Sequence, residues 1–158
     1  NAVADALEAI YGARWPWSPT FERSLPDPLQ GYSPRKDLQS ARRAAPTTGK
    51  VIPELKFVFW QKMFTSRYDT RVWDYHLRRV MPNLDPAKTI PELRKAIYSD
   101  LEKVRLLRNR IAHHEPIFTR ALGDDYQIIR TLIKYRCAVT AGWLDSNQTA
   151  TAIIAAKP

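Results

Sequence analysis

The spacing of apolar residues along the chain is that of helices. Between residues 91 and 113 apolar positions recur every three or four residues, so that they fall in one stripe of a long helix. The stripe consists of Leu93, Ile97, Leu101, Val104, Leu107 and Ile111. Strand-like alternation of apolar and polar residues never extends beyond four residues. The pattern therefore predicts an all-α protein.

Proline positions and the same periodicity predict the remaining helices. These cover residues 2–11, 34–45, 51–64, 69–80 and 124–144, with a weak last helix in the tail, 149–158. We place Pro53 in the first turn of the helix 51–64. In the helix 124–144 we expect five side chains to face the core: Ile128, Leu132, Tyr135, Val139 and Trp143.

Between the first two helices, residues 12–33 carry many prolines. We therefore expect a long ordered loop there, which its aromatic residues pin to the core. Together these expectations describe a single domain over residues 1–158, a bundle of about five to six helices with a Pro-rich N-terminal loop.

The composition is that of a folded, basic protein. Hydrophobic residues make up 44% of the chain, which is enough for a packed core. The formal net charge of +9 favours an anionic partner, RNA or DNA first, although basic residues also serve solubility alone. The chain begins at Asn1 rather than Met, inside an expected helix, so we expect further residues upstream.

Composition also limits cofactors and location. The single cysteine, Cys137, excludes an intramolecular disulfide and fits a reducing cytoplasm. Three histidines without a cluster of cysteines or carboxylates argue against a dedicated metal site, and no motif indicates a cofactor. No apolar run approaches the roughly 20 residues that span a bilayer. We therefore expect a cytoplasmic protein with no membrane partner.

Candidate chemistry gathers at the end of the expected helix 91–113. The segment from Arg108 to His114, RNRIAHH, is followed by Pro116, which disfavours helical geometry at the residue before it. Both histidines therefore fall in the last turn, where they form a dense cationic cluster with nearby arginines. Metal-independent RNA cleavage needs a general base, a general acid and a cation for the phosphorane, and histidine and arginine suit these roles.

A helical projection separates the residues of this segment. Arg108 lies at the edge of the core stripe and points about 140° away from His113. Asn109 and His113 share a second face with Tyr98, Glu102, Arg105 and Leu106. That face mixes apolar and hydrogen-bonding groups, as partner-binding surfaces do, and a symmetric dimer through it would bring two copies of the site together.

An arginine five residues before a histidine is by itself a short and common pattern. In a purely structural interpretation, Arg108 caps a helix end or pairs with a carboxylate, and both histidines only decorate the surface. The longer sequence around the pair carries more information.

The string from Leu107 to Ile117, LRNRIAHHEPI, resembles the R-N-x3-H signature of Abi-like abortive-infection proteins in the HEPN superfamily. The segment 53–69, followed by Trp73, is also similar to this family, so the resemblance covers about residues 50–120. Val58 stands where a small residue is typical. Some HEPN toxins carry a modifiable Tyr just after the histidine, where this chain has Glu115 and Pro116.

The resemblance implies a helical bundle, usually dimeric, with metal-independent endoribonuclease activity in bacterial defence, abortive infection or toxin–antitoxin systems. Its partners would be RNA, a second copy of the chain and an antitoxin protein that neutralises it. By this resemblance Arg108 and His113 are the catalytic pair, Asn109 positions the site and His114 assists.

Other residues are candidates for RNA contacts. Arg105 lies three residues before the signature, and Arg110 lies within it. On the helix 34–45, four basic residues could follow a phosphate backbone or form a solvated face: Arg35, Lys36, Arg42 and Arg43. Trp15 and Trp17 could stack bases, although proline-flanked aromatic residues more often anchor a loop. We expect His76 to be structural.

The sequence leaves three functions open. The first is a ribonuclease, and the second is a non-catalytic RNA-binding or assembly module that uses the same basic surface. The third is a purely structural helical domain with no affinity for RNA at physiological salt.

Overall fold

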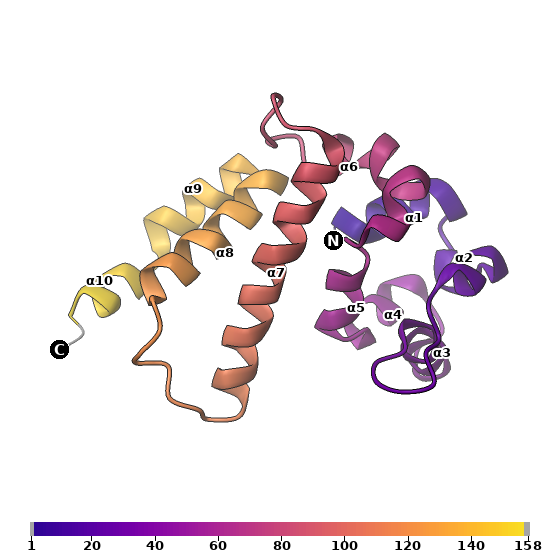
Figure 1. Cartoon of the computed structure of the whole chain (residues 1–158), viewed down its shortest axis with the longest axis horizontal. Coiled ribbons are helices and arrows are strands. Elements are labelled where there is room, and N and C mark those ends of the chain that lie inside the picture. Colours follow the sequence, from indigo (N-terminus) through magenta and orange to yellow (C-terminus); the bar gives the residue numbers. More distant parts are fainter. Residues whose placement is uncertain (1, 157–158) are drawn as a thin grey trace. The chain divides into compact units, whose positions relative to one another are not determined.

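The computed structural model describes residues 2–156, apart from the side chain of Ala44. Every regular element in this range is a helix, which confirms the all-α class (Figure 1). The chain forms two compact units, Asn1–Val80 and Met81–Pro158.

The N-terminal unit contains six α-helices and three short helical turns. The α-helices are α1 (Ala2–Tyr11), α2 (Pro19–Ser24), α3 (Pro34–Ala44), α4 (Thr48–Glu54), α5 (Phe57–Lys62) and α6 (Asp74–Val80). The turns are the 3₁₀ helices η1 (Trp15–Trp17) and η2 (Ser66–Tyr68) and the π-helix η3 (Asp69–Trp73).

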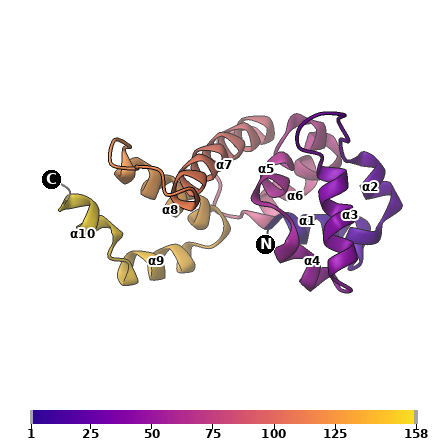
Figure 2. The same ribbon diagram turned by 90° about the horizontal axis from the view of Figure 1, so that it is seen from below.

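Two groups of contacts hold this unit together. Helix α1 packs against α6, and α3 lies against α2, α4 and α5 (Figure 2). Large side chains fill the space between them, and Trp15, Phe21 and Trp73 are fully buried. The rings of Phe64 and Trp73 stack with their centroids 4.6 Å apart. An aromatic core of this kind gives a small unit a large buried apolar area.

The C-terminal unit contains four α-helices: α7 (Ile90–Ala112), α8 (Leu122–Arg136), α9 (Ala138–Asn147) and α10 (Ala150–Ala155). Helix α8 contacts α7, α9 and α10. The start of α7 is fixed by Thr89, whose amide donates to the Glu92 carboxylate at 2.8 Å. This reciprocal cap explains why the helix begins where the sequence predicts.

Several predicted boundaries are confirmed. The helices expected over 2–11, 34–45 and 91–113 correspond to α1, α3 and α7 within one residue at each end. The helix expected over 69–80 corresponds to η3 followed by α6, and its first part is π-helical. In the tail, α10 ends at Ala155, and residues 157–158 lie outside the described range.

The loop expected over 12–33 is wrong in part, because this stretch contains η1 and α2. Ser18 caps α2, since its hydroxyl accepts from the Phe21 amide at 3.3 Å, and Pro19 occupies the first helical position. Proline is compatible with a helix start because its missing N–H would be unpaired there anyway. The expected anchoring of Trp15 to the core is confirmed.

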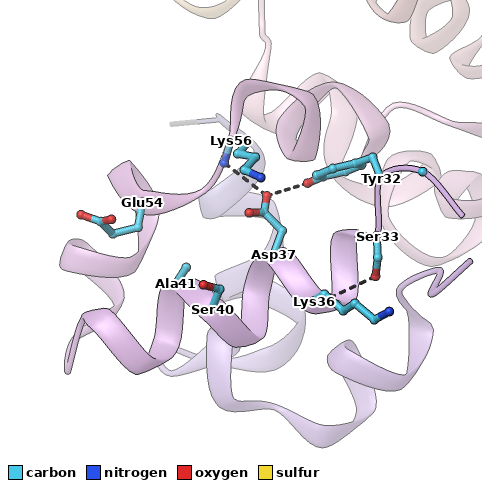
Figure 3. Close-up of a pocket in the computed structure, with 9 residues that line it drawn as sticks. Tyr32, Ser33, Lys36, Asp37, Ser40, Ala41, Glu54 and Lys56 are labelled. Carbon is cyan, nitrogen blue, oxygen red and sulfur yellow. Dashed lines mark hydrogen bonds between the residues drawn. The ribbon is translucent and has the colours of Figure 1, made fainter. Parts of the chain in front are cut away.

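The continuous helix expected over 51–64 is also wrong. The chain forms α4 and α5, with extended backbone at Leu55 and Lys56 between them. The amide of Lys56, instead of bonding one turn back, donates to Asp37 Oδ2 at 3.3 Å, and the Tyr32 hydroxyl donates to the same oxygen at 2.6 Å (Figure 3). Pro53 lies inside the last turn of α4 and not in a first turn.

The helix expected over 124–144 breaks at Cys137, whose backbone is extended. The Cys137 amide closes α8 on the carbonyl of Ile133, and its sulfur accepts from the Thr140 amide at 3.4 Å at the start of α9. The break resets the helical phase, so Val139 and Trp143, expected in the core, are 82% and 66% exposed. Such breaks raise the number of α-helices among the described residues to ten, against the predicted five to six.

Candidate functional site

The C-terminal end of α7 is closed by a Schellman turn. His113 is the C-cap residue, and its amide donates to the Asn109 carbonyl at 2.9 Å. The amide of His114 donates to the Ile111 carbonyl at 3.1 Å, and the amide of Glu115 donates to the Arg110 carbonyl at 2.8 Å. These two bonds satisfy helix-end carbonyls that would otherwise lack partners. The helix therefore keeps regular geometry through Ala112, and the backbone at His113 is fixed.

His114 occupies the left-handed position of this turn, with φ at 55°. Glycine is the usual residue there, because a Cβ atom makes this conformation unfavourable. No other non-glycine residue among those described has positive φ. The structure thus gives His114 a backbone role that the sequence analysis did not foresee.

Arg110 fastens the turn to the chain that follows it. Its Nη1 donates to the Pro116 carbonyl at 3.1 Å, and its Nε lies 3.8 Å from the Glu115 carboxylate. The guanidinium group expected as a possible RNA contact is therefore already engaged.

Arg105 is engaged as well. Its guanidinium group donates to both carboxylate oxygens of Glu102, with Nε 3.0 Å from Oε2. This hydrogen bonding raises the pKa of Arg105, and the pair holds both side chains along the helix surface.

The three residues of the R-N-x3-H signature differ from these neighbours. Within residues 2–156, no hydrogen bond or ion pair occupies the side chain of Arg108, Asn109 or His113. Arg108 and His113 are exposed, and Asn109 is half-buried. The side chains of Arg108, Asn109 and His113 thus remain available at this helix end, as does the exposed imidazole of His114.

The geometry brings Asn109 and His113 together but not Arg108. Residues four apart lie about 40° apart around a helix, whereas residues five apart differ by about 140°. Because α7 is regular through Ala112, no unwinding reduces the separation of Arg108 and His113. A single copy of α7 therefore presents the two groups in different directions.

The apolar stripe of α7 becomes exposed toward the same end. Leu93 and Ile97 are buried as expected, and Leu101, Val104 and Leu107 are half-buried. Ile111, expected in the core, is 54% exposed. Leu106 and, in the following loop, Phe118 are also exposed. Apolar surface thus surrounds the signature residues.

A second ion pair, which the sequence analysis missed, anchors the far end of the loop after α7. Arg120 donates from Nε and Nη2 to the two carboxylate oxygens of Asp125, at 2.9 and 2.6 Å. Among the described residues, Asp125 is the one charged residue that is buried. The five-residue spacing across a helix start is the only signal that could have indicated this pair.

The basic residues of α3 fall into two classes. Arg35 donates to the carbonyls of Glu22, Arg23 and Leu25, where α2 ends. Arg42 donates to the Pro16 carbonyl at 3.0 Å and to the Glu22 carboxylate at 2.6 Å. These two guanidinium groups join α3 to the preceding chain. By contrast, the side chains of Lys36 and Arg43 are exposed, and the Nζ of Lys36 lies 3.8 Å from Oδ1 of Asp27.

A polar hollow of about 400 Å³, which no sequence pattern indicated, lies beside α3 (Figure 3). Its charged lining residues are Lys36, Lys56, Asp37 and Glu54. Burial, followed by the hydrogen bond to Asp37, raises the pKa of Tyr32 in its wall. Two lysines balance two carboxylates there, so the hollow offers no net attraction for a polyanion.

The described residues hold no group of three or more His, Cys, Asp or Glu side chains placed to bind a metal ion. Among the described helices, none combines the length and hydropathy needed to cross a membrane.

Comparisons with known proteins add no relative to this picture. No family model matches the chain, and neither the curated proteins nor the solved structures include a match.

Proposed function

We propose that this chain is a metal-independent endoribonuclease of the HEPN type. The observation that carries the proposal is the availability of Arg108, Asn109 and His113 at an ordered helix end, where the neighbouring Arg105 and Arg110 are already engaged. The net charge of +9 supports an RNA substrate. In keeping with the resemblance, the enzyme would act in bacterial defence as a toxin or abortive-infection effector, with an antitoxin protein as its inhibitor.

In the proposed reaction the ribose 2′-oxygen attacks the adjacent phosphorus atom. His113 takes the proton from the 2′-hydroxyl and delivers it to the leaving 5′-oxygen, so that no proton is gained or lost overall. Arg108 stabilises the negative charge of the phosphorane through its guanidinium fork. The products are a 2′,3′-cyclic phosphate and a 5′-hydroxyl end. Asn109, on the same face as His113, orients the substrate.

The proposal places Arg108 and His113 of one cleft on two copies of the chain. One copy directs these side chains about 140° apart on a regular helix, which leaves no common position for one phosphate. A twofold symmetric dimer would place Arg108 of each copy opposite His113 of the other. The exposed Leu106, on the same face as Asn109 and His113, provides apolar surface for such a contact.

The test is cleavage of a labelled single-stranded RNA pool by the purified protein, with magnesium and with EDTA. We expect cleavage under both conditions and products with 2′,3′-cyclic phosphate ends. Arg108→Ala and His113→Ala should each lower the rate at least about 100-fold, given the usual contribution of a proton-transfer or charge-stabilising group. Lys103→Ala, which removes an exposed charge from the same helix, should cleave normally. Wild-type rates in both signature variants would disprove the proposal.

A non-catalytic RNA-binding or assembly module is the second candidate. The exposed apolar residues around the signature favour it, because they suit a protein contact whether or not RNA is cut. It predicts salt-dependent RNA binding without cyclic-phosphate products. The same assay, combined with a binding measurement, separates the two candidates.

A further inference from the structure

A second hollow in the N-terminal unit has the chemistry of a nucleotide site. It measures about 500 Å³ and is lined by Trp17, Gln39, Arg42 and Arg43. Trp17 ends the 3₁₀ turn η1, and the other three residues project from α3. An aromatic ring and guanidinium groups thus line one open hollow at the surface.

The back of this hollow is rigid. Glu22 accepts from Gln39 Nε2 at 2.7 Å and from Arg42 at 2.6 Å, and Arg42 also donates to the Pro16 carbonyl. The hydrogen bond from Gln39 and the contacts with Arg42 lower the pKa of Glu22. These bonds join η1, α2 and α3, so that Gln39 and Arg42 in the wall of the hollow are held in place before any ligand arrives.

The charge around the hollow is positive. The guanidinium carbon of Arg14 lies 5.2 Å from the centroid of the Trp17 ring. Arg42 and Arg43 line the hollow itself, and the Arg42 guanidinium is paired with the Glu22 carboxylate. Arg14 and Arg43 are exposed, so an incoming anion can reach their charges. The hollow in Figure 3, where two lysines balance two carboxylates, has no such excess of positive charge.

The aromatic component distinguishes this surface from a solvated basic face. Trp15, two residues earlier, is fully buried, whereas Trp17 is only half-buried and borders the hollow. Anchoring alone does not explain why Trp17 borders a hollow lined by arginines. Proteins that bind single-stranded nucleic acid combine a cationic groove with an aromatic ring on which a base stacks.

We propose that this hollow binds one nucleotide of a single-stranded RNA, with the base against Trp17 and its phosphate at Arg43. The choice of RNA rests on the proposed ribonuclease function, whereas the base-and-phosphate chemistry rests on the hollow itself. Arg42 and Gln39 act as positioning residues that fix the wall. The site would hold substrate away from the cleavage residues and add affinity without taking part in the chemistry.

The test measures binding of a fluorescein-labelled 12-nucleotide RNA by anisotropy, in the full chain carrying Arg108→Ala so that the RNA stays intact. We expect Trp17→Ala to weaken binding about 5- to 100-fold, the usual effect of losing a base-stacking ring. Trp17→Phe, which keeps a ring, should retain most of the affinity. Arg43→Ala should weaken binding and reduce its salt dependence by about one phosphate contact.

Arg71→Ala is the matched control, because this exposed arginine of η3 does not line the hollow. Unchanged affinity in both Trp17→Ala and Arg43→Ala, with circular dichroism showing that both fold, would overturn the proposal. Competition by adenosine monophosphate distinguishes the source of the ligand. If micromolar adenosine monophosphate displaces the labelled RNA, the hollow is a site for free nucleotides. If millimolar adenosine monophosphate displaces none of it, the hollow is a site for a nucleotide within a longer strand.

The binding measurement does not depend on cleavage, since it uses a variant whose cleavage is strongly slowed. Unchanged RNA affinity in the Trp17 and Arg43 variants, together with RNA cleavage by the wild-type chain, would overturn only the nucleotide site. RNA binding at the hollow without any RNA cleavage by the wild-type chain would overturn only the proposed ribonuclease activity.

Discussion

The carbonyl oxygen of Arg110 accepts a hydrogen bond from the amide of Glu115, five residues later, at 2.8 Å. The bond closes the end of α7 and forces His114 into the left-handed conformation between them. The same arginine then holds the Pro116 carbonyl with its side chain. His113 is therefore presented by a turn that the neighbouring residues fix from both sides.

Replacement of His114 by glycine should stabilise the C-terminal unit. Glycine adopts positive φ without strain, so His114→Gly is expected to raise the free energy of unfolding by about 0.5–1 kcal/mol, despite the greater freedom it gives the unfolded chain. Urea denaturation followed by circular dichroism measures this change. His114→Ala, which retains the Cβ atom, serves as the control and should not stabilise.

The same glycine variant tests the assistant role that the resemblance implies for His114. If the contribution of His114 is its backbone, His114→Gly should cut RNA at close to the wild-type rate. A stable His114→Gly protein with cleavage reduced about 10-fold or more would instead show that the imidazole takes part in the reaction.

Mixed dimers should reveal whether the cleft is shared between two copies. When Arg108→Ala and His113→Ala proteins are unfolded together and refolded in equal amounts, about half of the dimers contain one of each. Each mixed dimer has one cleft with both groups intact, so that about a quarter of the wild-type activity should return. Each variant refolded alone provides the baseline. Activity that stays at this baseline, although mixed dimers are detected by native mass spectrometry, would place both groups on one copy.

Local signals explain which elements the sequence could predict. Helix α7 begins at the cap formed by Thr89 and Glu92 and ends before Pro116, and all three residues are visible in the sequence. Ser33 and Pro34 mark the start of α3 in the same way. Boundaries of this kind depend on hydrogen bonds within one helical turn, which residue type and spacing reveal.

Tertiary contacts explain what the sequence could not predict. The break after α4 depends on the carboxylate of Asp37, which accepts from Lys56, 19 residues away. Arg35 and Arg42 looked like free cations because the groups they bind lie 10 to 26 residues earlier. At the candidate site, the sequence identified the signature residues, whereas the bond from Arg110 to the Pro116 carbonyl depends on the turn that follows α7.

Substitutions in the C-terminal unit should distinguish a buried position on α7 from an exposed position on α9. Ile97 is fully buried, so Ile97→Ala is expected to lower the free energy of unfolding by about 2–5 kcal/mol. Trp143 follows the break at Cys137 and is 66% exposed. Trp143→Ser should therefore change stability by less than about 0.5 kcal/mol. If urea denaturation gave Trp143→Ser a loss close to that of Ile97→Ala, α8 and α9 would have to be one continuous helix.

Acid should weaken the N-terminal unit through Glu22. The hydrogen bond from Gln39 and the contacts with Arg42 lower the pKa of this carboxyl below its ordinary value. A carboxyl with a lowered pKa in the folded state stabilises the protein above its unfolded pKa, and that contribution disappears as the pH falls through the folded value. Glu22→Gln removes the titrating group, so the variant should be about 1 kcal/mol less stable than wild type at pH 7, with the difference shrinking below about pH 4. Thermal unfolding of both proteins between pH 7 and pH 3 measures the convergence, with Glu54→Gln, an exposed carboxyl of α4, as the control. A difference that stayed constant over this range would mean that the Glu22 network contributes shape and packing but no charge-dependent stability.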